Sequence, residues 1–228
     1  MPRVACILVL LLAVSQFGFA HGVTGSDADF LKTVSGPHVG AFLYLGAKHM
    51  VTGYDHLLFL FGVIFFLYRL RDVAVYVTCF AIGHSITLLA GVLSGVHVNP
   101  YLVDALIGFS VVYKAFDNLD GFHTLFGWEP NAKAAVFLFG LIHGFGLATK
   151  LQDFALSSKG LITNIISFNV GVEIGQLVAL SIILAIIIAY RRTSGFIRQA
   201  VLANVLLMTA GFALAGYQIA GYVLGPTA

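Results

Sequence analysis

Six long apolar blocks dominate the sequence and limit the folds that it can adopt. A membrane-spanning helix needs about 20 predominantly apolar residues. Only α-helices and closed barrels satisfy every backbone polar group in lipid, and the blocks lack the alternation typical of barrel strands. The sequence therefore predicts an all-α, polytopic membrane bundle of six transmembrane helices. The blocks cover residues 41–68, 73–95, 100–118, 133–150, 161–190 and 197–224.

The composition supports the same class of protein. Apolar residues make up 59% of the 228 residues and charged residues 10%, whereas a soluble domain carries about 25% charged residues. The mean hydropathy is +0.96. A net charge of +2 is too small to indicate nucleic-acid binding. Cys6 and Cys79 both lie in apolar stretches, so no disulfide framework is expected.

The first 20 residues have the pattern of a cleavable signal peptide. Arg3 precedes an apolar core, and Gly18 and Ala20 supply small residues before a cleavage site. Because the apolar core is too short for a span, cleavage is favoured over an uncleaved anchor helix. The predicted organisation is a signal peptide over 1–20, a short outer segment over 21–40 and a six-helix transmembrane domain over 41–228.

The distribution of arginines predicts the orientation of the chain. If the mature chain starts outside, six spans place all its arginines in inner loops, as the positive-inside rule requires. The sequence thus predicts a multi-pass protein of the bacterial inner (cytoplasmic) membrane, with both mature termini on the periplasmic side. Trp128, in the inner loop 117–132, is expected at the lipid interface. The arginines concerned are Arg69, Arg71, Arg191, Arg192 and Arg198.

Ionisable residues inside the apolar blocks point to a functional site. Such residues are costly in lipid and usually face the bundle interior, and here His and acidic residues occur at similar depths on four spans. The candidate metal ligands are His49, Asp55, His56, His84, His143 and Glu173. The residues expected to support them are Thr52, Gly53, Ser85, Thr87, Asp104, Asn169 and Gln176.

Helical spacing indicates which of these side chains can meet. Asn169, Glu173 and Gln176 are four and three residues apart, so they share one helix face. At a rise of about 1.5 Å per residue, His84, His143 and Glu173 lie near the membrane midplane. Asp55 and His56 lie somewhat nearer the outer face. We therefore expect these three imidazoles and two carboxylates to converge in a cavity that is displaced toward the outer face.

The first block contains its own pair of histidines. His49 and His56 are seven residues apart and share a face if the segment is a continuous helix. Gly53 lies between them and can interrupt the helix, as broken helices do at transport sites. In contrast, His97 and His123 fall in loops and are expected to be ordinary loop histidines.

The chemistry of this residue set favours a divalent transition metal. Imidazole is the commonest metal ligand, and imidazole with carboxylate suits nickel, cobalt, zinc or copper better than magnesium. Each residue also has a structural reading: a buried His such as His84 can simply bond a neighbouring helix, and Glu173 can be a protonated structural acid. The ordered set as a whole favours a metal site.

Five sequence elements, in order, resemble the HupE/UreJ-type membrane protein family. This resemblance implies a role in transition-metal handling, and members linked to hydrogenase and urease systems are regarded as nickel or cobalt permeases. It associates the metal with His49, Asp55 and His56, from the element H-x-x-x-G-x-D-H. Asp104 stands where Glu is expected, and the flank after His56 resembles a divergent branch. The elements cover 49–59, 81–88, 103–110, 139–148 and 168–176.

Three functions remain open from the sequence. A nickel/cobalt-type permease is favoured, which makes the chain a transporter rather than an enzyme. The alternatives are a membrane-embedded metal hydrolase for a lipid-linked substrate and a metal-binding assembly factor for another membrane complex. No G-x-x-x-x-G-K loop occurs, so no ATP-driven motor is encoded here. The expected partners are the lipid bilayer and a metal ion, with a homo-oligomer or a membrane-complex partner left open.

Overall fold

The computed structural model describes residues 26–152, 158–192 and 195–225. The predicted signal peptide lies outside these ranges. Every regular element within them is a helix, which confirms the all-α class. The helices are α2 (Ser26–Thr33), α3 (Val39–Thr52), α4 (Tyr54–Ile64), α5 (Leu70–Ser94), α6 (Pro100–Asn118), α7 (Gly121–Phe126), α8 (Ala132–Gln152), α9 (Leu161–Arg191) and α10 (Phe196–Leu224).

The six predicted blocks all fold as helices at nearly the predicted positions. The first block is divided into α3 and α4, and the others form α5, α6, α8, α9 and α10. Four helices are long and apolar enough to cross a membrane: α5, α8, α9 and residues 198–224 of α10. This establishes a multi-pass membrane protein. The remaining two blocks do not meet this criterion of length and composition. Helix α6 carries three charged residues, Asp104, Lys114 and Asp117, and α4 is a shorter apolar helix.

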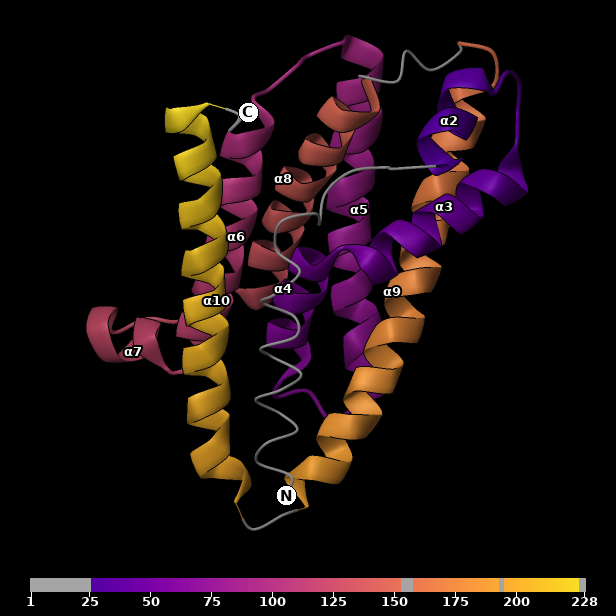
Figure 1. Ribbon diagram of the computed structural model, residues 1–228. Coiled ribbons are helices and arrows are strands. Elements are labelled where there is room, and N and C mark those ends of the chain that lie inside the picture. The colour runs from indigo at the N-terminus through magenta and orange to yellow at the C-terminus, as the bar shows by residue number, and fades with distance from the viewer. Residues whose placement is uncertain (1–25, 153–157, 193–194, 226–228) are drawn as a thin grey trace.

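The long helices form a layer in which each packs against its neighbours in the order α10, α6, α8, α5, α9 (Figure 1). Helix α3 runs obliquely across the layer and packs on α9, while α4 contacts both α6 and α9. Helices α9 and α10 extend beyond the end of α4 at the side where they are joined (Figure 1). The second half of the first block, α4, therefore lies between α6 and α9, whereas the first half, α3, packs on the outside of α9.

Glycines allow these helices to approach closely. A Cβ atom on Gly46 of α3 would lie 1.9 Å from the carbonyl oxygen of Phe168 on α9. At the crossing of α5 and α8, a Cβ on Gly140 would lie 2.4 Å from the carbonyl oxygen of Phe80. Neither distance is tolerable for a side chain, so these crossings require glycine, as is common between membrane helices.

The C-terminal end of α4 is held by polar contacts from two other helices. Arg191, at the end of α9, donates hydrogen bonds to the carbonyls of Phe65 and Leu67, and its guanidinium lies 4.0 Å from the ring centroid of Tyr68. Asn118 of α6 donates to the carbonyl of Gly62 at 2.8 Å. These contacts fix the chain where it turns from α4 into α5.

Candidate functional site

The helix break at Gly53 creates the central feature of the site. Gly53 has φ −76° and ψ 91°, which ends α3 and starts α4, and its N–H donates to the carbonyl of His49 at 2.8 Å. A Cβ here would lie 3.0 Å from both that carbonyl oxygen and Nδ1 of His56. The predicted interruption is therefore confirmed, and a larger residue would press on the His56 ring.

Four histidines from four helices meet beside this break, and we call them the imidazole cluster: His49, His56, His84 and His143. The ring of His56 is central. Its centroid lies 4.5 Å from that of His143, 5.2 Å from that of His49 and 6.5 Å from that of His84. His56, His84 and His143 are buried. The structure thus brings together one histidine more than the sequence analysis expected to converge.

The carboxylate of Asp55 orients the central ring. Its Oδ1 lies 2.9 Å from Nδ1 of His56, and both side chains are buried. A carboxylate on one imidazole nitrogen fixes the tautomer and the orientation of the ring. Asp55 therefore lies within the predicted site, in contact with its central imidazole.

Phenylalanine rings surround the imidazoles. Phe80 has its centroid 6.2 Å from that of His56, 6.0 Å from that of His84 and 5.0 Å from that of His143. Phe59 lies 5.8 Å from His143 by the same measure. Aromatic rings from α4 and α5 thus form an apolar wall around the imidazoles. Neither phenylalanine was predicted as a site residue, although each lies one helical turn from a site histidine.

His84 is held by an amide from α9. Its Nδ1 lies 3.0 Å from Oδ1 of Asn169. Its Nε2 is buried and has no hydrogen-bond partner among the residues that the structure describes. A buried nitrogen without a partner is uncommon in proteins, and here it is a ring atom that can bind a metal ion. The donor set of the site thus suits the ion that the sequence analysis expected.

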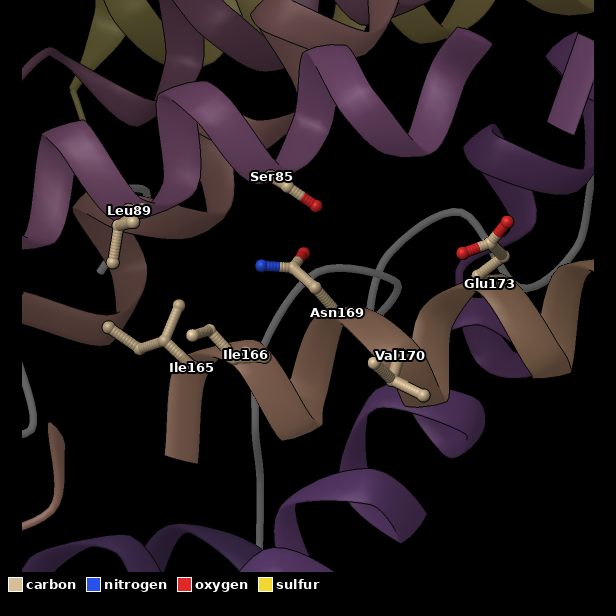
Figure 2. Close-up of a pocket in the computed structure, with 7 residues that line it drawn as sticks. All are labelled: Ser85, Leu89, Ile165, Ile166, Asn169, Val170 and Glu173. Atoms are coloured by element: carbon tan, nitrogen blue, oxygen red, sulfur yellow. The ribbon is translucent and has the colours of Figure 1, made fainter. Parts of the chain in front are cut away.

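Glu173 lies in a groove between α5 and α9. The groove has a volume of about 190 Å³ and is lined by Ser85, Leu89, Ile165, Ile166, Asn169, Val170 and Glu173. Figure 2 shows the Ser85 hydroxyl and the Asn169 amide facing each other, with Glu173 further along α9. Thr78 donates to the Glu173 carboxylate at 3.3 Å. Asn169 is thus the residue that contacts the cluster and also lines the groove.

The remaining predicted supporting residues have different roles. Thr87 donates to the carbonyl of Leu141 at 2.6 Å and so ties α5 to α8 beside the cluster. Thr52 is exposed and donates to the carbonyl of Lys48 within α3 at 2.8 Å. Gln176 is fully buried, and neither of its amide atoms has a hydrogen-bond partner in the described ranges. Of these three, Gln176 therefore has polar atoms available to a ligand or a water molecule.

Asp104 belongs to an ion pair between α6 and α8. Both of its carboxylate oxygens accept hydrogen bonds from Lys150, at 3.1 and 2.9 Å. This pair was not predicted from the sequence. The positions of the two residues could have indicated it, because Asp104 lies near the start of α6 and Lys150 near the end of α8, and these two helices pack against each other.

The imidazoles are not arranged around a common point. No group of three or more His, Cys, Asp or Glu side chains, within the part of the chain that the structure describes, has the geometry to hold a metal ion. Ligands of one ion would have to aim their nitrogens at a position about 2 Å from each. The cluster therefore supplies the right donors, and the rings would have to rotate to share an ion.

Fold and site together define a multi-pass helical membrane protein with buried imidazoles at a broken helix. A family model described as HupE / UreJ protein matches residues 24–225, nearly the whole chain. The protein therefore belongs to this family, which confirms the resemblance seen in the sequence. Membership suggests a membrane protein involved in nickel or cobalt handling. No match was found among curated proteins or solved structures.

Proposed function

We propose that the protein is a permease that carries a divalent transition-metal ion of the nickel or cobalt type across the inner membrane. The observation that carries this proposal is the imidazole cluster, in which rings from α3, α4, α5 and α8 lie next to one another at a helix break. Broken helices at the membrane midplane are typical of substrate sites in transporters.

The spacing of the rings supports passage rather than permanent binding. Conduction needs sites that bind well enough to admit an ion and weakly enough to release it. Ring centroids 4.5 to 6.5 Å apart allow an ion held by two imidazoles to exchange one ligand at a time. His49 lies at the end of α3 and receives the ion first, and the His56 ring, held by Asp55, transfers it to His84 and His143.

Glu173 takes up the ion beyond the cluster in this proposal. The contact between His84 and Asn169, and the place of Asn169 in the groove with Glu173, support such a route. Gln176 supplies a further amide along the same face of α9. An intramembrane carboxylate is also expected to attract a cation, since its charge is costly in lipid.

The proposal includes six crossings, with α3–α4 and α6 completing the four long spans. The charges of α6 are consistent with a membrane position, because Asp104 pairs with Lys150, and Lys114 pairs with Asp117. Signal cleavage and both termini on the periplasmic side belong to the same arrangement. An interior-negative potential then drives a divalent cation inward by about 4.6 kcal/mol per 100 mV, so the chain needs no ATP-driven motor.

The test is uptake of nickel(II) and cobalt(II) into proteoliposomes that carry an interior-negative potential. His56→Ala is expected to abolish uptake, and Asp55→Asn and Glu173→Gln to reduce it at least tenfold. His97→Ala is the matched control, because His97 is an exposed loop histidine bonded to Gln152. Uptake equal to wild type in His56→Ala, in protein with unchanged helical circular dichroism, would reject the proposed route.

A further inference from the structure

The connection between α6 and α8 carries an unusual apolar surface. Leu125, Phe126 and Trp128 are 67%, 61% and 56% exposed. They lie in and just after the six-residue helix α7, which projects sideways from the bundle beyond α10 (Figure 1). We call these three residues the α7 apolar tip. Such a contiguous apolar tip on a connecting segment needs a partner that covers it.

The position of α7 is fixed by its local structure. Asp120 adopts φ +61°, a left-handed conformation that reverses the chain after α6. Gly121 follows because a Cβ there would lie 2.4 Å from the Phe116 ring. The ring of Phe122 packs on Tyr113 and Phe116, with centroids 5.0 and 4.9 Å away. The packing of Phe122 against α6 therefore fixes α7 and keeps the α7 apolar tip away from the bundle.

Helix lengths determine the depth of the tip. Helix α6 has 19 residues and α8 has 21, which correspond to about 28 and 31 Å at 1.5 Å per residue. The hydrocarbon core of a bilayer is about 30 Å thick. If both helices cross the membrane, as proposed above, the short connection between them lies at the boundary of the inner leaflet.

The charges near the tip identify the kind of surface that it fits. Asp120 lies 3.6 Å from His123, and Glu129 and Lys133 add one charge of each sign. With His123 neutral these groups sum to a net charge of −1, so the connection lacks the cluster of basic residues that anionic lipids attract. Apolar and aromatic side chains, in contrast, favour the region between headgroups and acyl chains.

We propose that the α7 apolar tip inserts into the inner leaflet and makes α7 a lateral membrane anchor for the inner ends of α6 and α8. The partner is the headgroup–acyl boundary of the bilayer. The inference rests on the proposed crossing of these two helices and is independent of metal transport.

The sequence contains a single tryptophan, so Trp128 fluorescence of the intact protein reports on the tip alone. In vesicles of neutral phosphatidylcholine we expect emission at shorter wavelength than free tryptophan in water. Lipids spin-labelled near the headgroup should quench it strongly, and lipids labelled at the chain end or aqueous iodide should quench it weakly. Added anionic lipid or salt should leave this pattern unchanged.

A double variant, Leu125→Ser with Phe126→Ser, should increase iodide quenching at least twofold, while His123→Gln on the same helix should not. Strong iodide quenching of the wild type would overturn the anchor. Protection from both iodide and lipid quenchers would also overturn it and would indicate that a protein surface covers the tip. Metal uptake in the double variant separates the two proposals, since it stays at the wild-type level if only the anchor is lost.

Discussion

Two sides of the bundle, α5 with α8 and α6 with α10, have the same close helix packing but differ in their buried polar groups. On one side, α5 crosses α8 at Gly140, and the helices carry His84 and His143 of the imidazole cluster. On the other side, α6 crosses α10 at Gly108, where a Cβ would lie 2.7 Å from the backbone nitrogen of Ala215. Close glycine crossings are thus a property of the whole bundle and do not by themselves mark the site.

The two sides differ in whether their buried polar atoms have hydrogen-bond partners. Between α6 and α10, Asn118 donates to Asn204 at 2.9 Å, and Asn204 donates to a backbone carbonyl of its own helix. On the other side, Nε2 of His84 and the amide of Gln176 are buried without hydrogen-bond partners among the described residues. A ligand is expected on the side where protein groups leave polar atoms available.

The ion pair between Asp104 and Lys150 joins the two sides, and its loss should have the largest effect. Lys150→Met leaves a buried carboxylate without its cation, which should cost about 3 kcal/mol of stability. Unfolding of the purified protein in detergent measures this. The double variant Lys150→Met with Asp104→Leu should recover most of the loss. Additive losses in the double variant would contradict the pairing.

Added methyl groups at the two glycine crossings should destabilise both sides but affect metal binding on one. Gly140→Ala and Gly108→Ala should each lower the stability by about 2 kcal/mol, because backbone atoms must move apart. Nickel binding, measured by titration calorimetry under folded conditions, should weaken in Gly140→Ala alone. Equal weakening in Gly108→Ala would show that the two sides are not functionally distinct.

Two asparagines that form contacts between helices, the half-buried Asn169 and the buried Asn204, allow a finer comparison. Asn169→Ala removes the partner that orients His84 and should lower the nickel affinity about 10- to 100-fold, as is typical when a residue that orients a metal ligand is lost. Asn204→Ala should leave the affinity unchanged, although it removes a buried hydrogen bond. The measurement is competition with a metal-binding dye. Unchanged affinity in Asn169→Ala would separate His84 from the metal.

The smallest effects are expected at the loop histidines. His97 and His123 are exposed and lie away from the cluster, beside Gln152 and Asp120 respectively. His97→Ala and His123→Ala should bind nickel as the wild type does in the same dye assay. A loss of affinity in either variant would place a second metal contact in the loops.

The sequence predicted the helical class, the six helical blocks and the residues that could bind metal. The predictions of the helical class and of the blocks are confirmed, because lipid imposes a strong local constraint of about 20 apolar residues per helix. Gly53 was also recognisable as a break, since glycine disfavours a continuous helix. The metal role of these residues remains a prediction.

Only the tertiary structure decided which residues meet. His49 and His56 lie close although the helix between them is broken. Glu173 lines a groove between α5 and α9, and Asp104 pairs with Lys150. These outcomes depend on the rotation and crossing of each helix, which are set by glycine contacts between segments far apart in the chain. Helical spacing within one segment carries no information about such contacts.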